Sequence, residues 1–254
     1  MEYLKGGEPF SLGSGDCGVL LFHGFTGSPF EVRAFGEALQ RRGYRVFAPA
    51  LAGHATSHAD LNGISAQHYL RAAETAYEHA AAKCTQLFVA GLSLGGSLAL
   101  HLAACRPVAG VITISAPVFL SPLLSSAVPL LHRFAPQAMP RINFSALQGR
   151  VVGYSRTTIA SIGAALDVFA QVKAGLASIE APILIVHSRR DLSVPVANAH
   201  YIHAHVSSEQ RSLKVLQRGQ HLLTLPAYLP LFEDDVYGFL KVLQPRRPER
   251  QRSV

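Results

Sequence analysis

Six short apolar runs alternate with longer helical patterns along this chain of 254 residues. The runs have no polar face, and the segments between them repeat apolar residues at helical spacing. The expected strands are Cys17–Phe22, Tyr44–Ala48, Gln86–Ala90, Val108–Ser115, Ile183–His187 and Ser212–Leu216. The expected helices are Pro29–Arg42, Ala66–Lys83, Ser93–Cys105, Thr157–Ile179, Val194–Val206 and Ala227–Leu243. Because strands buried on both faces read as continuous apolar runs, we predict an α/β fold with a mostly parallel central sheet and helices on both faces.

One stretch, residues 118–156, interrupts this alternation. It is rich in proline and in scattered large apolar residues, and it is too long for a plain connection between elements. We predict a small cap inserted into a single core formed by residues 1–117 and 157–244, for which an apolar composition of 49% is sufficient. The apolar side chains of the cap either pack on the core alone or also roof a hydrophobic pocket.

Composition excludes several other classes of protein. Three of the seven net positive charges come from residues 245–254, where we expect a basic, disordered tail. The remaining basic residues show no nucleic-acid motif, so nucleic acid is not an expected partner. The chain has no run of 18 apolar residues and no apolar leader, which predicts a cytoplasmic protein without a transmembrane segment. The widely spaced Cys17, Cys84 and Cys105 favour reduced thiols over disulfides.

The segment Gly91-Leu-Ser-Leu-Gly95 joins an expected strand to an expected helix. A serine between two glycines at such a turn is typical of a nucleophile elbow, because the turn is too tight for side chains two positions either side of the serine. The helix N-terminus also favours a developing oxyanion. The pattern occurs in ordinary strand-to-helix turns as well, so a base and an acid have to accompany Ser93.

The search for the acid is short, because no Asp or Glu occurs between Glu78 and Asp167. Asp191 closes a loop directly after the expected strand Ile183–His187 and is the best candidate. Asp167 lies within an expected helix. The alternative role for Asp191 is to cap the next helix or to pair with a neighbouring arginine.

His221 is the best candidate for the base, since it lies in a loop after the last expected strand and follows the acid in the chain. The amide of Leu94, next to the candidate nucleophile, is one expected oxyanion donor. The amide of Phe25, in the glycine-containing loop after the first expected strand, is the other. His23, two residues earlier, is expected to be a buried structural histidine.

Two histidine pairs, His54 with His58 and His200 with His203, have spacings that could hold a metal ion. No carboxylate or cysteine near either pair completes a zinc site. We therefore predict neither a metal nor a cofactor.

Five motifs occur in the order and spacing of a known family. They are His23-Gly-Phe-Thr-Gly-Ser-Pro29, Gly53-His54, Gly91-Leu-Ser-Leu-Gly-Gly96, Ser188-Arg-Arg-Asp-Leu-Ser-Val-Pro195 and Gln220-His221. From about Val19 to Leu243 the chain resembles small bacterial carboxylesterases and monoacylglycerol lipases of the α/β-hydrolase superfamily. The resemblance implies the α/β-hydrolase fold, Ser93 as nucleophile, Asp191 as acid and His221 as base.

The same resemblance implies that the amides of Phe25 and Leu94 form the oxyanion hole, and that a small cap covers a pocket for an acyl chain. The chain departs from the family's usual pattern at Ala55, often glycine, and at Gln220, often a small residue. Both departures could reshape the alcohol side of the pocket.

The leading functional hypothesis is hydrolysis of short- to medium-chain carboxylic esters, including monoacylglycerols, through an acyl-enzyme. The expected partner is a small-molecule ester with an apolar acyl chain. The candidate acyl-binding residues are Phe25, Phe119, Leu123, Leu131 and Phe144. The alternatives are acyl transfer or carbon–carbon bond hydrolysis on the same fold, and a non-catalytic binding protein.

Overall fold

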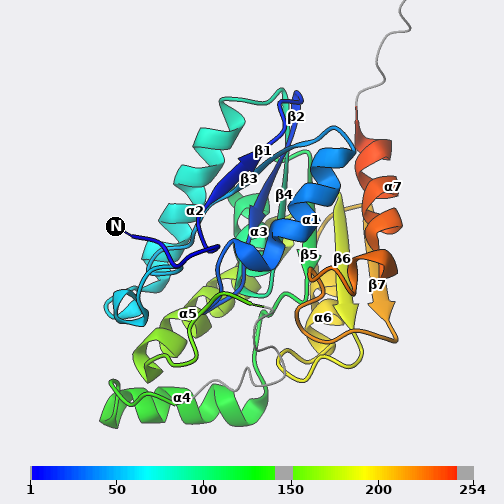
Figure 1. The fold of residues 1–254 in the computed structure, drawn as a ribbon. Coiled ribbons are helices and arrows are strands. Elements are labelled where there is room, and N and C mark those ends of the chain that lie inside the picture. The colour runs from blue at the N-terminus through cyan, green and yellow to red at the C-terminus, as the bar shows by residue number, and fades with distance from the viewer. Residues whose placement is uncertain (1, 141–150, 245–254) are drawn as a thin grey trace, which may run out of the picture.

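The computed structural model describes residues 2–140 and 151–244. A seven-stranded sheet has the order β1-β3-β2-β4-β5-β6-β7 and is parallel except for β1, which pairs antiparallel with β3 at one edge (Figure 1). The strands are β1 (Phe10–Leu12), β2 (Cys17–Phe22), β3 (Arg45–Ala48), β4 (Gln86–Leu92), β5 (Gly110–Ile114), β6 (Ile183–Ser188) and β7 (Arg211–Leu216). All six expected strands are present at these positions.

Helices cover both faces of the sheet, which confirms the predicted fold class (Figure 1). One face carries α1 (Phe30–Arg41) and α7 (Glu233–Leu243), and the other carries α2 (Ala66–Ala81), α3 (Leu94–Cys105), α5 (Ile159–Gly175) and α6 (Ala197–His205). The described residues also form the short 3₁₀ helices η1 (His58–Leu61), η3 (Leu176–Ser178) and η4 (Leu229–Leu231). The central strands β2, β4 and β5 are almost entirely buried because two layers of helices enclose them.

Among the described strands and α-helices, β1 and α4 were not expected from the sequence. β1 has only three residues and lies at the sheet edge, so it leaves too little pattern to be recognised. The helix α4 (Pro122–Phe134) forms within the expected cap segment and contains Pro129. It packs on α5, below the C-terminal ends of the parallel strands (Figure 1).

Some large apolar side chains of α4 are exposed to solvent, beside His132 and Arg133. Leu130 is 61% exposed and Phe134 is 75% exposed, whereas Val128 is buried. Residues 141–150 of the expected cap lie outside the described residues, as does the expected tail 245–254. The division into core, cap and tail remains a prediction.

The stretch Ile159–Ser178 is long and apolar enough to cross a membrane by length and composition alone. In the structure it forms α5 and η3, and α5 packs against α2, α3 and α4. Its small and apolar side chains therefore pack against neighbouring helices of the fold.

Candidate active site

Ser93 lies at the turn between β4 and α3, with φ 54° and ψ −123°. A residue with a side chain rarely adopts this conformation, which costs on the order of 1–3 kcal/mol. A Cβ on Gly91 would collide with the Gly95 carbonyl, and a Cβ on Gly95 would collide with the carbonyls of Phe22 and His23. Backbone sterics therefore require both glycines, as expected for a nucleophile elbow.

Asp191 and His221 meet at the C-terminal ends of β6 and β7. His221 Nδ1 lies 2.7 Å from Asp191 Oδ2. The Asp191 carboxylate is fully buried, and the His221 side chain is 20% exposed and lines the same cavity as Ser93. The structure thus brings the three predicted residues to the same end of the sheet.

Two serines hold the loop that carries His221. Ser115, which follows β5, donates its hydroxyl to the His221 carbonyl at 2.9 Å. Ser188, at the end of β6, donates to the Gly219 carbonyl at 2.7 Å. The loop is therefore tied to two strands besides β7. The sequence could not reveal these bonds, because each acceptor is a backbone carbonyl at least 31 residues away.

Four donors surround the Asp191 carboxylate. Oδ1 accepts the amides of Ser193 and Val194, both at 2.9 Å, while Oδ2 lies 2.7 Å from His221 Nδ1 and 3.4 Å from His187 Nε2. Burial alone would raise the pKa of Asp191, but hydrogen bonds from His187 and His221 and from the Val194 amide hold that pKa well below its ordinary value. The carboxylate is ionised at neutral pH. The fully buried His187 is a neighbour of Asp191 that the sequence did not reveal.

The Phe25 amide lies between two amides that are already engaged. Gly24 N–H donates to Glu31 Oε2 at 3.1 Å, and Thr26 N–H donates to His54 Nε2 at 2.9 Å. Among the described residues the Phe25 amide has no acceptor, and Phe25 lines the cavity beside Ser93. This pattern leaves the Phe25 N–H available to a substrate.

Leu94 is the first residue of α3 and follows Ser93 directly. N–H groups in the first turn of a helix have no acceptor within the helix, and the helix dipole favours negative charge there. The amides of Gly96 and Ser97 bond to the Ser93 carbonyl instead. No acceptor for the Leu94 amide is found among the described residues, and its role as an oxyanion donor stays a prediction.

His23 and His54 are buried cross-links between this loop and the loop after β3. Burial lowers the pKa of His23 well below its ordinary value and that of His54 to about 4, so both rings are neutral. His54 accepts the Thr26 amide through Nε2, and its Nδ1 lies 2.9 Å from the Ala52 carbonyl. His23 accepts the Leu51 amide through Nε2 at 3.0 Å. His23 therefore contributes to structure, as predicted.

Glu31 on α1 is a buried carboxyl group that sequence reasoning missed. It lines the cavity, accepts the Gly24 amide, and packs so closely on Gly27 that no Cβ fits there. Burial raises its pKa to about 7. The carboxyl group therefore fixes the backbone just before Phe25.

Residues 151–154 attach the far end of the expected cap segment to the same loop. The Tyr154 amide donates to the Thr26 carbonyl at 2.7 Å, and its hydroxyl donates to the Gly53 carbonyl at 3.1 Å. Ser28 donates its hydroxyl to the Val152 carbonyl at 2.6 Å. Tyr154 had no recognisable signal in the sequence, because all of these contacts are distant along the chain.

A cavity of about 200 Å³ opens beside Ser93. Polar groups gather near Ser93, and the remaining wall is mostly apolar, with a large share from α5. The lining residues are Gly24, Phe25, Thr26, Glu31, Ser93, Pro117, Leu120, Ile162, Ala165, Phe169, Ser193, Val194, His221 and Leu222. Such a wall suits an apolar chain attached to a polar reacting group.

The expected acyl-binding residues are only partly at this cavity. Phe25 lines it, but Phe119 packs edge-on against Tyr201 at 5.7 Å between ring centroids and does not line it. Leu131 is 45% exposed on α4 and is also outside the lining. The difference arises because α5, which the sequence placed in the core, supplies the wall instead. The Leu123 side chain and all of Phe144 lie outside the described residues.

Neither histidine pair gathers a set of metal ligands in the described ranges 2–140 and 151–244. Both ring nitrogens of His54 are engaged within the loop network, which removes it as a partner for His58. His200 and His203 lie on α6, and no third ligand lies beside them among the residues that the structure describes.

Comparison with known proteins gives one consistent group of relatives. The profile of the hydrolase family described as serine aminopeptidase, S33, matches residues 16–225. A thermostable monoacylglycerol lipase from Bacillus sp. (strain H-257) is 34% identical over 231 residues, which cover 90% of this chain and 92% of the relative. A carboxylesterase from Bacillus subtilis (strain 168) is 28% identical over 245 residues, which cover 93% and 97%.

Solved structures agree with these sequence relatives. One of the metagenome-derived lipolytic enzymes LipS and LipT superposes with a TM-score of 0.82 at 30% identity, covering 94% of this chain and all of the other. A soluble variant of monoglyceride lipase from Saccharomyces cerevisiae has a TM-score of 0.80 at 17% identity, covering 93% and 92%, and supports the fold alone.

Proposed function

The chain belongs to the α/β-hydrolase family described as serine aminopeptidase, S33, and on this premise we propose that it is a serine carboxylic-ester hydrolase that works through Ser93, His221 and Asp191. The observation that carries the proposal is the strained Ser93 at its glycine-flanked turn, in one cavity with a histidine whose other nitrogen bonds a buried carboxylate. The relatives named monoacylglycerol lipase and carboxylesterase support ester hydrolysis in particular.

In the proposed reaction, Ser93 Oγ attacks the ester carbonyl. The Nδ1–H of His221 is directed at Asp191, which leaves Nε2 to take the Ser93 proton and return it to the departing alcohol. Water then attacks the acyl-enzyme. His221 takes the proton from this water and returns it to Ser93 Oγ as the acid leaves. The ionised Asp191 keeps the imidazole in this tautomer and stabilises it while it is charged.

The tetrahedral intermediate carries its negative charge on the former carbonyl oxygen. We assign the amides of Phe25 and Leu94 as donors to that oxygen, because neither has an acceptor among the described residues. Donors fixed before the reaction need no rearrangement as charge develops, and the loss of one such donor typically costs about 10²–10³ in kcat.

The substrates we assign are short- to medium-chain esters, with monoacylglycerols among them. A cavity of about 200 Å³ is below the usual range of roughly 300–1,000 Å³ for drug-sized ligands, which favours a limited acyl chain. Ala55 takes φ 63°, a conformation that glycine adopts without strain. This departure from the family pattern lies in the loop that His54 anchors. We therefore assign the acyl half of the substrate more narrowly than its alcohol half.

The test is a substrate panel with a covalent probe. The purified protein should hydrolyse p-nitrophenyl esters and monoacylglycerols and should act far more slowly on aminoacyl p-nitroanilides. A fluorophosphonate should label Ser93, and labelling should persist in Ser193→Ala, which lacks the other serine lining the cavity. Faster transfer of the acyl group to an added alcohol than to water would indicate an acyltransferase. Labelling without turnover of any ester would contradict the proposal.

A further inference from the structure

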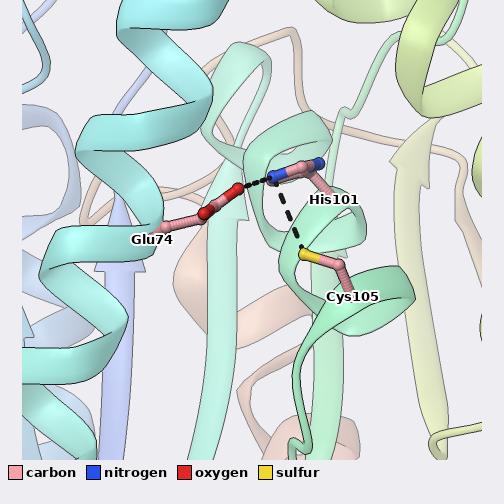
Figure 2. A group of neighbouring side chains, drawn as sticks. All are labelled: Glu74, His101 and Cys105. Atoms are coloured by element: carbon pink, nitrogen blue, oxygen red, sulfur yellow. Dashed lines mark hydrogen bonds and ion pairs between the residues drawn. The ribbon is translucent and has the colours of Figure 1, made fainter.

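Three side chains from two helices converge on one point of the surface between α2 and α3 (Figure 2). Glu74 belongs to α2, and His101 and Cys105 lie one turn apart on α3. One ligand atom from each lies within 4.8 Å of the others. We propose that Glu74, His101 and Cys105 bind a divalent transition-metal ion of the zinc class.

The contacts within this group share a single atom. His101 Nε2 lies 2.9 Å from Glu74 Oε1 and 3.7 Å from Cys105 Sγ (Figure 2). The carboxylate and the thiol therefore point at the same side of the imidazole rather than at its two nitrogens, which is not the arrangement of a catalytic triad. Ligand atoms that bind zinc lie about 2.0–2.3 Å from the ion, so a convergent O, N and S set needs only a small opening to admit it.

The surroundings allow entry and hold the carboxylate in place. Cys105 is exposed, and the side chains of His101 and Glu74 are 20% and 30% exposed. Arg106 Nη2 lies 2.9 Å from the second carboxylate oxygen of Glu74, so Oε1 stays directed at the site. Such outer partners orient metal ligands. Glu78, 3.9 Å from Arg106, offers that guanidinium a second partner when the Glu74 charge is shared with an ion.

The donor set determines the class of ion. One thiolate, one imidazole and one carboxylate favour zinc and its neighbours over Mg²⁺ or Ca²⁺, and three protein ligands leave a fourth position for water. When the ion binds, the Cys105 thiol releases its proton to solvent and a sulfur–metal bond forms. A simple ion pair between the helices would need Glu74 and Arg106 only, so it leaves the position of Cys105 unexplained.

The cluster is separate from the proposed catalytic residues. Ser93 precedes the first turn of α3, whereas Cys105 is the last residue of that helix, about 18 Å along its axis. Variants at the cluster can therefore be judged for intact folding by their ester hydrolysis and thermal unfolding.

The experiment is titration of the metal-free, full-length protein with Co²⁺, followed by absorbance. We expect one equivalent to give the visible bands of a tetrahedral site and a thiolate-to-cobalt charge-transfer band, both removed by excess Zn²⁺. Cys105→Ser should lose the charge-transfer band, and His101→Asn should lower Co²⁺ affinity by about tenfold or more. Cys84→Ser removes another thiol of the same chain and should behave like the wild type.

Two results would overturn the inference. One is a wild-type protein that gives no charge-transfer band with Co²⁺. The other is a band that survives in Cys105→Ser or disappears in Cys84→Ser, because the sulfur ligand would then be a different cysteine.

Discussion

No Cβ fits at Gly91 or Gly95, whereas Leu130 and Phe134 on α4 are more than half exposed. The turn around Ser93 is enclosed by the backbone of β2, β4 and α3, so geometry dictates which residues it accepts. Within the described part of the chain, α4 packs mainly on α5 and leaves apolar side chains in solvent. The comparison teaches that backbone contacts determine the turn at Ser93, whereas α4, in the expected cap, is held by fewer contacts and leaves apolar side chains exposed.

The sharpest test of the first region is Ser93→Ala. Removing Oγ removes the attacking atom and little else, so kcat/KM for p-nitrophenyl esters should fall on the order of 10⁴-fold or more while thermal unfolding stays cooperative. Activity within tenfold of the parent, in a preparation free of other esterases, would show that the tight turn does not carry the nucleophile.

Asp191→Asn should have the next largest effect. The amide keeps the shape of the carboxylate but favours the wrong imidazole tautomer, and the expected loss in kcat is on the order of 10³–10⁴-fold. Asp167→Asn is the matched control, because Asp167 lies on α5. If the Asp167 change were the damaging one, the assignment of the acid to the end of β6 would be wrong.

Glu31→Gln tests how firmly the Phe25 loop is held as pH changes. The folded pKa of Glu31 is raised from 4.5 to about 7 by burial, so between these values the unfolded chain gives up its proton before the folded one does. Stability is therefore lost as pH rises through this window, by up to about 3 kcal/mol. The free energy of unfolding in urea should fall less between pH 5 and pH 8 in Glu31→Gln than in the wild type.

The control for that experiment is Glu37→Gln, an exposed change on the same helix. It should keep the pH dependence of the wild type. If the free energy of unfolding changed equally with pH in Glu31→Gln and the wild type, the Glu31 carboxyl group would be in contact with water and not buried.

The smallest expected effect concerns acyl selectivity. Phe169 on α5 lines the cavity, so Phe169→Ala should move the best p-nitrophenyl ester toward longer chains, with each added buried methylene contributing up to about 0.8 kcal/mol, roughly fourfold in kcat/KM. Leu131→Ala should leave the profile unchanged, because its side chain is exposed on α4. A shift in the Leu131 variant alone would mean that α4, and not α5, lines the site of the acyl chain.

The sequence predicts well what local rules control. Continuous apolar runs identified all six parallel strands, and the spacing of Gly91 and Gly95 predicted the turn at Ser93. It predicts poorly what depends on distant contacts. Phe119 and Leu131 were expected at the acyl chain because they are large and apolar within the irregular segment, but the path of the chain turns Phe119 toward Tyr201 and Leu131 toward solvent.

Other site residues gave no signal for the same reason. The role of Glu31 depends on burial against Gly24 and Gly27, and that of His187 depends on the loop folding Asp191 back over it. A lone acid on a helix and a lone histidine in a strand do not indicate such partners. The Glu74 group was missed because its carboxylate lies 27 residues before His101.

The bonds from residues 151–154 to the loop before α1 tie the end of the expected cap to the loop of the proposed oxyanion donor. Tyr154 is hydrogen-bonded to Thr26 and Val152 to Ser28, both just after Phe25, which lines the cavity. A displacement of residues 151–154 must either break these bonds or carry Thr26 with it. In the reaction we propose, a substrate that displaces residues 151–154 would therefore also move the Phe25 loop, whose amide we assign to its own transition state.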